Sequence, residues 1–395
     1  MTSRATAARD ELLPQARRLY ERASQDHRAG RHRDAEAAYT AGASLLRRAV
    51  GARHPELADL LAAHAELKTE LGDYHGGLAL ARAAYAVVEG LRGDAARRVR
   101  ARSLGATGNI HRALGDYPRA GACLRRALAV ARRGGETHET AIALNNLGIL
   151  YKYTCEFDRA ALHYRRALRI TRRICGAEHP DVAGLYHNLG GLAFTQGRYR
   201  SAERWGRAAL ELRTRLSGTG GIAVAADAAA LAASLDGLGR HAEAQQLYHR
   251  VLVFFRTHYG ARHYEIAVNL NNIGASLYAE GKLAEAAGRY RAALQMKQRL
   301  LGDRHIDVAL TANNLGVLYL KQHRYRLAAR HIDQARAIFA RRLGADHPKT
   351  AAATANQRAL RDARRHRPAA AQPGWQHSTR HSSHNRSPIA QRGNP

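Results

Sequence analysis

The chain has 395 residues, of which 45% are hydrophobic and only 6% aromatic, and its formal net charge is +30. Its three cysteines, Cys123, Cys155 and Cys175, are too few and too scattered for a disulfide framework or a zinc cage. No apolar run reaches the length of a membrane span, and the N-terminus lacks the apolar stretch of a signal peptide. We therefore expect a cytoplasmic protein with reduced thiols.

The positive charge is almost entirely arginine, because only six of the 63 basic residues are lysine. A skew of this kind, beside abundant alanine and glycine, is typical of a GC-rich coding sequence. The charge will attract polyanions whatever its origin. Because coding bias accounts for part of the charge, the charge is weak evidence for function.

A unit of about 42 residues repeats eight times along the chain. Short turn segments such as LGDYPRA recur at spacings of 40 to 43 residues. Their turn residues, in chain order, are Gly30, Gly72, Gly115, Cys155, Gly197, Gly239, Gly281 and His323. The position is glycine in six of the eight copies, so the fourth turn, at Cys155, is expected to close differently. Each unit reads as a helix A, the turn, and a helix B.

Two other positions of the unit are always small. The residue seven before each turn residue and the residue five after it are Gly or Ala in every copy, as at Gly148 and Ala160. Glycine inside a helix costs about 1 kcal/mol relative to alanine, so its recurrence needs a packing reason. Two helices that cross closely at these points supply that reason.

The loops between units contain a glycine, and three of them read His-Pro: His54–Pro55, His179–Pro180 and His347–Pro348. Proline suits the first turn of the helix that follows, where its missing N–H costs nothing. Because histidine recurs here with the repeat, also at 263 and 305, we interpret these residues as structural.

The pattern resembles the tetratricopeptide repeat, and its 42-residue form is similar to the repeats of kinesin light chain and its bacterial relatives. The resemblance implies an all-α protein, an α-solenoid wound into a right-handed superhelix, with helix A on the concave side and helix B on the convex side. We expect about eight repeats plus a capping helix over residues 10–366. Residues 367–395, which are basic and contain Ser, His and Pro, are predicted to be a disordered tail.

Asparagine, a poor helix former, recurs on helix A just before the packed glycine. The resemblance implies that these amides project into the groove and hydrogen-bond the backbone of a bound peptide, since an amide offers both a donor and an acceptor. The second asparagine of the pair recurs as Asn146, Asn188, Asn272 and Asn314, and the first as Asn145, Asn271 and Asn313. The alternative is that the amides bond loop or helix-end groups between repeats and never meet a ligand.

Groove neighbours are expected six and seven residues beyond the second asparagine. They are Lys152, Tyr153, Phe194, Tyr278 and Lys321. This wall suits an extended, acidic peptide segment with an apolar anchor, although the aromatic residues could equally be inter-repeat core. Repeats one to three and repeat six lack the asparagines.

The sequence contains no catalytic or phosphate-binding motif, so we expect no enzyme activity and no cofactor or metal. The favoured function is a protein–protein interaction scaffold, in a bacterial cell, that binds an extended peptide in its concave groove. Two alternatives remain open. One is nucleic-acid binding through arginines on the convex B helices, concentrated in residues 92–173; the other is sensing of a short signalling peptide, which predicts a closed superhelix.

Overall fold

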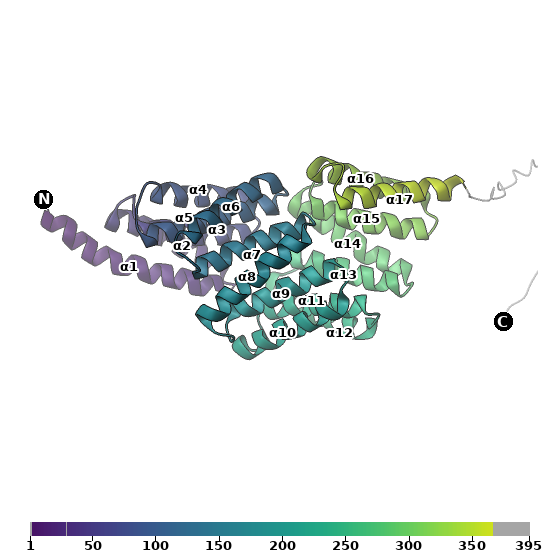
Figure 1. The fold of residues 1–395 in the computed structure, drawn as a ribbon, viewed down its shortest axis with the longest axis horizontal. Coiled ribbons are helices and arrows are strands. Elements are labelled where there is room, and N and C mark those ends of the chain that lie inside the picture. Colours follow the sequence, from purple (N-terminus) through teal and green to yellow (C-terminus); the bar gives the residue numbers. More distant parts are fainter. Residues whose placement is uncertain (1, 29, 366–395) are drawn as a thin grey trace, which may run out of the picture.

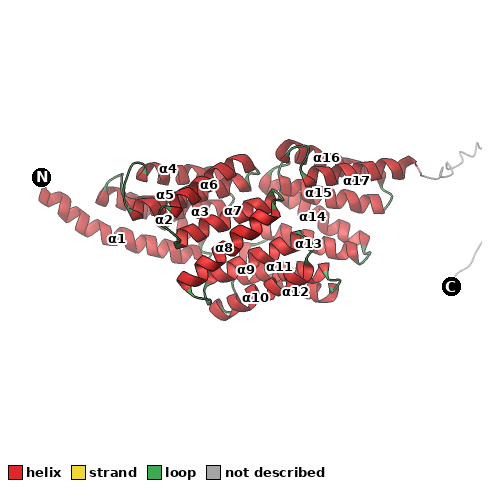
Figure 2. Ribbon diagram, in the orientation of Figure 1, coloured by secondary structure: helices red, strands yellow, loops and turns green. Residues whose placement is uncertain are grey.

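The computed structural model describes residues 2–28 and 30–365, and within these ranges it contains seventeen α-helices and no strand (Figures 1 and 2). The expected disordered tail, 367–395, lies outside the described residues. The helices are α1 (Thr2–Arg28), α2 (His32–Val50), α3 (Pro55–Glu70), α4 (Tyr74–Val88), α5 (Asp94–Ala113), α6 (Tyr117–Arg132), α7 (His138–Tyr153), α8 (Phe157–Cys175), α9 (Pro180–Thr195), α10 (Tyr199–Ser217), α11 (Ile222–Gly237), α12 (His241–Tyr259), α13 (Tyr264–Ala279), α14 (Leu283–Leu301), α15 (Ile306–Lys321), α16 (Tyr325–Leu343) and α17 (Pro348–Arg365).

The helices stack as consecutive antiparallel pairs, as the repeat predicts. Each odd-numbered helix packs on its even-numbered partner and on the next odd-numbered helix, whereas successive even-numbered helices do not pack on one another. The odd helices therefore form the inner, concave layer and the even helices the outer one. The chain is an α-solenoid of eight helix pairs closed by α17, and the predicted fold class is confirmed.

The recurring glycines of the inner helices lie where a side chain of the outer helix crosses. A Cβ built on Gly148 would lie 2.6 Å from the ring of Tyr164, and one on Gly316 would lie 2.7 Å from Cγ1 of Ile332. Contacts this short do not occur between real atoms, so any residue larger than glycine would push the paired helices apart. The packing reason expected from the sequence is present.

The turns at Cys155 and His323 close in the same way as the glycine turns, so the expectation of a different fourth turn was wrong. Cys155 and His323 have φ values of 63° and 59°, in the left-handed region that the turn glycines also occupy. The amide of Glu156 donates to the carbonyl of Tyr151 at 2.8 Å, as the amide of Asp116 does to that of His111 in the glycine turn of the third repeat. The hydrogen bond imposes the left-handed conformation, and a non-glycine residue tolerates it at some cost.

The loop histidines are helix caps. Nδ1 of His54, His179, His263 and His305 accepts a hydrogen bond from the backbone amide two residues ahead, at 3.1 to 3.3 Å. His347 does the same for Lys349. These rings satisfy one of the unpaired amides at the start of each inner helix, which explains why histidine recurs with the repeat.

The superhelix touches itself where its C-terminal repeats pass its N-terminal ones (Figure 1). His305 Nε2 lies 2.6 Å from the carbonyl oxygen of Ala113, a residue 192 positions earlier. Beside this contact, Cδ1 of Ile306 lies 3.0 Å from the place of a Cβ on Gly115. The end of α5 therefore meets the start of α15.

Two further contacts flank this one. The ring of His258, at the end of α12, lies 2.7 Å from the place of a Cβ on Gly30, in the turn between α1 and α2. At the start of α17, Lys349 Nζ lies 5.8 Å from the ring centre of Tyr153, at the end of α7. We call these three contacts the seam. One hydrophobic cluster accordingly contains buried residues both from α5–α9 and from α13–α17.

Candidate functional site

The predicted asparagines form a ladder of hydrogen bonds between neighbouring inner helices. Nδ2 of Asn188 donates to Oδ1 of Asn145 at 2.8 Å, and Asn314 donates to Asn271 at 3.4 Å. Asn356 on α17 donates to Asn313 at 3.0 Å. The second asparagine of each repeat thus bonds the first asparagine of the repeat before it. All are half-buried, so each amide also keeps hydrogen-bonding capacity that the ladder leaves unused.

Two of the predicted amides lack this partner. Among the described residues, the side chains of Asn146 and Asn272 make no hydrogen bond, because the preceding repeats have Gly105 and Ala229 at the position of the first asparagine. A Cβ built on Gly105 would lie 3.5 Å from Nδ2 of Asn146. Asn146 and Asn272 are therefore the amides of the ladder that are most available to a ligand.

The other predicted residues have mixed environments. Tyr153 and Tyr278 are half-buried and pack against the core, while Phe194 is 39% exposed. Lys321 Nζ lies 4.8 Å from the ring centre of Tyr278. Lys152 reaches across to the next inner helix, where its Nζ lies 3.4 Å from the place of a Cβ on Gly191. The lysines thus lie along the inner layer, over aromatic rings.

A pocket of about 960 Å³ opens on the concave side of the first four repeats. It is lined by three successive inner helices, α3, α5 and α7, and its wall includes Asn146 and Arg112. The small residues Gly105 and Ala106 occupy the two asparagine positions of the third repeat, which leaves this part of the wall open. The pocket therefore lies N-terminal to most of the predicted amides, and only Asn146 among them lines it.

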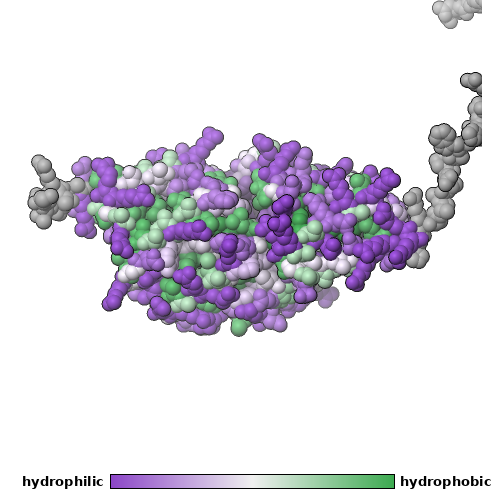
Figure 3. All heavy atoms as spheres, turned by 90° about the horizontal axis from the view of Figure 1, so that it is seen from above, coloured by the Kyte–Doolittle hydropathy of each residue, from purple (hydrophilic) through white to green (hydrophobic). Residues whose placement is uncertain are grey.

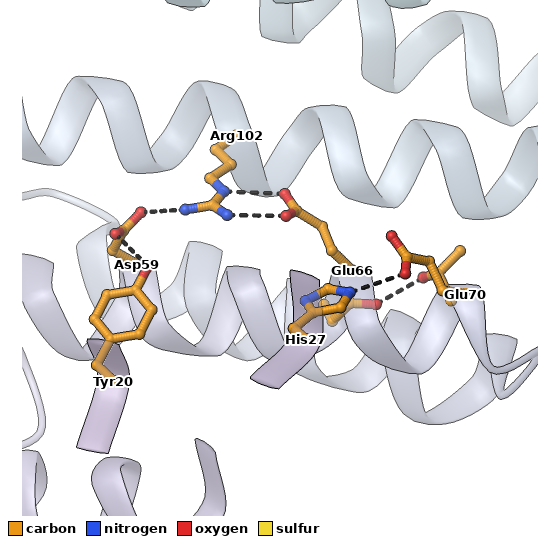
Figure 4. Close-up of polar contacts among 8 residues, drawn as sticks. Tyr20, His27, Asp59, Glu66, Glu70 and Arg102 are labelled. Carbon is orange, nitrogen blue, oxygen red and sulfur yellow. Dashed lines mark hydrogen bonds and ion pairs between the residues drawn. The ribbon is translucent and has the colours of Figure 1, made fainter. Parts of the chain in front are cut away.

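A network of charged side chains crosses the floor of this pocket (Figure 4). Arg102 on α5 binds Glu66 through two hydrogen bonds of 2.9 and 3.0 Å, and donates a third of 2.7 Å to Asp59. The hydroxyl of Tyr20 on α1 donates to Asp59 at 2.7 Å. Three repeats are joined by these contacts, because the residues come from α1, α3 and α5.

The network is electrostatically stable. Burial by itself would lower the pKa of Arg102, but the hydrogen bonds and charges of Glu66 and Asp59 raise it. Burial, followed by the charge of Asp59, raises the pKa of Tyr20. Arg102 is therefore charged, and Tyr20 neutral, near neutral pH.

Sequence reasoning missed this network, because it searched the inner helices for asparagine. Charged residues on the inner face of two successive A helices, with opposite signs one repeat apart, were a usable signal. Arg102 lies 36 residues after Glu66 and 43 residues after Asp59, and 43 is also the separation of the paired asparagines.

The arginines of the outer helices are in part neutralised. Glu136 forms ion pairs with Arg166, Arg169 and Arg173, and Arg159 pairs with Glu156, the residue that precedes α8. The space-filling view shows polar side chains over most of the visible face, with apolar patches between them (Figure 3). A solvated convex surface accounts for this pattern.

Residues 2–28 and 30–365 contain no cluster of histidine, cysteine and acidic side chains that could hold a metal ion. Within the same ranges, no helix has the length and apolarity to cross a membrane.

Comparisons with known proteins agree with this architecture. A family model described as tetratricopeptide repeat matches residues 99–173, 163–215, 181–257, 265–339 and 307–372. Protein KINESIN LIGHT CHAIN-RELATED 1 of Arabidopsis thaliana is 30% identical over 103 residues, which are 26% of this chain and 17% of that protein. The chain therefore spans less than a fifth of that relative.

Two solved structures share the fold. A Rap protein complexed with Competence and Sporulation Factor superposes with a TM-score of 0.58, over 78% of this chain and 89% of that chain, at 14% identity. NprR in complex with its cognate peptide NprX gives a TM-score of 0.52, over 70% of this chain and 82% of that chain, at 17% identity.

Proposed function

The chain belongs to the tetratricopeptide repeat family, and from that premise we propose that it binds a short peptide, or the end of a partner chain, on its concave face. The observation that carries this proposal is the seam, at which His305 contacts Ala113. An open groove can accept the middle of a long extended segment. A superhelix that touches itself restricts that route, and a short peptide or a free chain end fits better.

The pocket beside the seam has suitable dimensions and chemistry. Its volume of about 960 Å³ lies at the upper end of the range for ligand pockets. The free amide of Asn146 can pair with the backbone of any peptide, and Val99 and Ile142 give the wall apolar surface. The charged groups that surround these residues would then determine which side chains of the peptide are accepted.

The structural relatives support this direction by analogy. The Rap protein structure contains Competence and Sporulation Factor, the NprR structure contains its cognate peptide NprX, and their fold resembles this one at low sequence identity. A shared fold does not by itself show a shared ligand. The analogy has weight here because it agrees with the seam and the free amides.

We propose that the chain acts without catalysis, as a receptor or scaffold in the cytoplasm, and that a bacterial cell is its setting. Its three cysteines form no disulfide with one another. Binding of nucleic acid by the convex arginines is the alternative outcome of the experiment below.

The test is capture of peptides from the cell that makes the protein. The purified chain is incubated with the fraction of the lysate below about 3 kDa and separated by gel filtration, and bound peptides are released and read by mass spectrometry. A captured peptide is then synthesised and its affinity measured by calorimetry. We expect the Asn146→Ala/Asn272→Ala/Asn314→Ala variant to bind it about tenfold more weakly or worse, because hydrogen bonds to the peptide backbone are lost.

Two controls make the result specific. His305→Asn keeps a side chain that can cap α15 but removes the reach to Ala113, and should weaken peptide binding by opening the seam. His54→Asn makes the same change at a cap outside the seam and should leave binding unchanged. A ligand that all three variants retain, and that rising salt removes, would move the function to the convex arginines.

A further inference from the structure

A second cavity opens at the C-terminal end of the superhelix, where α15, α16 and α17 lie side by side (Figure 1). It has a volume of about 590 Å³ and is formed by the turn between α15 and α16, the first turn of α16 and the end of α17. We call it the rim cavity. Within the described residues no Asp or Glu lines it. Its lining residues are His323, Arg324, Tyr325, Arg326, Leu327 and Arg364.

The three arginines of the rim cavity have no partner of opposite charge. Within residues 2–28 and 30–365, Arg324, Arg326 and Arg364 form no ion pair, and their side chains make no hydrogen bond. The guanidinium carbon of Arg324 lies 5.2 Å from the ring centre of Tyr319, a contact that orients the cation without neutralising it. The cavity therefore has positive charge that the described part of the chain leaves unbalanced.

Arginine is an unusual choice at one of these positions. Arg324 is the N-cap residue of α16, and its side chain makes no capping hydrogen bond. The corresponding N-cap residues of α4 and α6 are Asp73 and Asp116, whose carboxylates accept from the amides of Gly76 and Arg119. A cation at the positive end of a helix is unfavourable, and here it also replaces a capping acceptor. An anion in the rim cavity would offset both costs.

The turn that carries the cavity is strained at a residue of its wall. His323 stands where six of the eight repeats have glycine, and its φ of 59° lies in the left-handed region. Its Nδ1 lies 3.1 Å from the hydroxyl oxygen of Tyr325, so the imidazole is held beside a second ring of the cavity. Glycine would relieve the backbone and remove the imidazole, which indicates that the imidazole has a use.

The fifth repeat contains the same turn and serves as an internal comparison. The turn there reads Arg198, Tyr199 and Arg200, in register with Arg324, Tyr325 and Arg326. The ring of Tyr199 lies against Gly237 of the next inner helix, α11, and Leu238 follows that glycine. The position of Leu238 corresponds to Arg364 at the end of α17. The C-terminal rim thus has a third arginine where the fifth repeat has leucine.

We propose that the rim cavity binds the diphosphate group of a small organic ligand through Arg324, Arg326 and Arg364. A guanidinium pairs with phosphate oxygens through two parallel hydrogen bonds. Charge selects the anion, because a carboxylate would neutralise only one of the three cations. A single phosphate monoester carries about two negative charges, and a diphosphate carries more. The site lies apart from the concave pocket, so the proposal does not depend on peptide binding.

The remaining wall of the rim cavity suits the organic part of such a ligand. Its volume of about 590 Å³ is within the range of small-molecule sites and exceeds what two phosphates need. The rings of His323 and Tyr325 and the side chain of Leu327 supply aromatic and apolar surface beside the arginines. A nucleoside diphosphate combines the two chemistries that this wall offers.

Calorimetry on the full chain tests the class of ligand. The probes are ADP, pyrophosphate and AMP, at about 0.15 M salt, where screening weakens non-specific attraction to a basic protein. We expect ADP and pyrophosphate to bind, and AMP to bind about tenfold more weakly because it brings less charge. AMP that binds as tightly as ADP would overturn the diphosphate assignment. So would a thymidine dodecanucleotide that binds when ADP does not, since the arginines would then serve a nucleic-acid backbone.

Arginine variants locate the site. Arg324→Gln and Arg364→Gln should each weaken ADP binding about tenfold. Arg198→Gln is the matched control, because it removes one positive charge from the same position of the fifth repeat, and it should leave the affinity unchanged. If Arg198→Gln weakens ADP binding as much as Arg324→Gln does, ADP responds to the charge of the whole chain and the rim cavity is not its site.

His323→Gly separates binding from folding. Glycine suits the left-handed turn, so this variant should unfold at a higher temperature than the wild type. It should nevertheless bind ADP about threefold more weakly, because one ring of the wall is lost. A loss of affinity in a stabilised protein cannot come from misfolding. Unchanged affinity for ADP would show that the organic part does not lie against this wall, and would overturn the nucleoside diphosphate as the ligand.

Discussion

The two ends of the concave wall hold their inner helices together by different means. In the N-terminal part, α1, α3 and α5 are linked by Arg102 and its carboxylates, around an open pocket. In the C-terminal part, α13, α15 and α17 are linked by asparagine pairs, with Asn314 on Asn271 and Asn356 on Asn313. Both linkages join residues 43 positions apart, one repeat along the chain.

The difference shows how one repeat can build two surfaces. Where the preceding repeat carries the first asparagine, the second asparagine of the next repeat is hydrogen-bonded to it. Where Gly105 and Ala106 replace them, the amide of Asn146 is free and the wall is hollow. At the pocket, small residues on the inner face therefore leave room for a ligand, and the positions without asparagine are as informative as those with it.

The helix packing beneath both walls should respond alike to substitution, and this is the largest expected effect. Gly108→Val and Gly316→Val each place a Cβ within 2.7 Å of an outer-helix side chain, Leu124 or Ile332. We expect each variant to lower the free energy of unfolding by about 2–3 kcal/mol through overpacking. Hydrogen exchange of the affected helix pair measures the loss locally, which matters because solenoids can unfold by parts.

Gly288→Ala is the matched control for these variants. Gly288 lies inside α14 with nothing within 4 Å of a built Cβ, so alanine should raise stability by about 0.5–1 kcal/mol. Equal losses of unfolding free energy in Gly108→Val and Gly316→Val would support a common scaffold under the two walls. A loss at one of them alone would contradict it.

The polar linkages should differ, since the N-terminal wall depends on charge. Arg102→Met removes three hydrogen bonds and leaves Asp59 and Glu66 without their cation, which we expect to cost about 1–2 kcal/mol for these partly exposed groups. Asn271→Ala removes one neutral hydrogen bond from the C-terminal wall and should cost about 0.5–1 kcal/mol.

The measurement is the denaturation midpoint of each variant at low and at high salt. Only the cost of Arg102→Met should shrink as salt rises, because screening weakens the ion pairs in the wild type. A cost for Asn271→Ala that depends equally on salt would remove the distinction between the two walls.

Most of the fold could be predicted from the sequence, because it is set within each repeat. The spacing of the turn residues and the small residues at Gly148 and Ala160 are local signals of helix pairing, and the loop histidines are local signals of helix starts. The seam could not be predicted, since it depends on the rotation between repeats summed over the 192 residues from Ala113 to His305.

The candidate site was only partly accessible for the same reason. Asn145 and Asn188 could be placed on the inner face, but their pairing depends on the offset between adjacent repeats. Tyr153 and Lys152 could be placed near the groove, whereas Lys349 reaches them only across the seam. Contacts within one repeat follow from the pattern, and contacts between distant repeats do not.

A single substitution should convert the N-terminal wall into the C-terminal type. Gly105→Asn supplies the missing first asparagine of the third repeat, with its Cβ 3.5 Å from Nδ2 of Asn146. We expect a gain in stability of about 0.5–1 kcal/mol, from the lost glycine and the new hydrogen bond. Peptide binding should fall about tenfold, since the free amide is consumed and the pocket is filled.

Ala229→Asn makes the same change for Asn272, outside the pocket, and serves as its control. It should stabilise the chain to a similar degree without affecting a ligand held in the pocket. The readouts are the unfolding midpoint and the affinity of the captured peptide. If Gly105→Asn leaves affinity unchanged, the hollow wall is not where the peptide binds.

The last expected effect concerns the seam, where the two halves meet at histidines. His263 caps α13 through Nδ1, and its ring stacks on Tyr259 with 3.6 Å between ring centres. Burial, followed by the charges of His32 and His258, lowers the pKa of His263 to about 4. Burial also lowers the pKa of His32 at the start of α2, and the charge of Glu70 opposes this only in part. Glu265 lies in the first turn of α13, and Glu70 pairs with His27.

This depressed pKa makes the seam sensitive to acid. In the unfolded chain His263 has an ordinary pKa of about 6.5, so its contribution to stability is present above that pH and is lost as the pH falls toward 4. We expect unfolding stability to drop by about 1 kcal/mol between pH 7 and pH 5, and small-angle scattering to show a larger radius of gyration. His263→Asn, which can still cap α13, should flatten this dependence, whereas His54→Asn should preserve it. An unchanged pH profile in His263→Asn would mean that other titrating groups govern the seam.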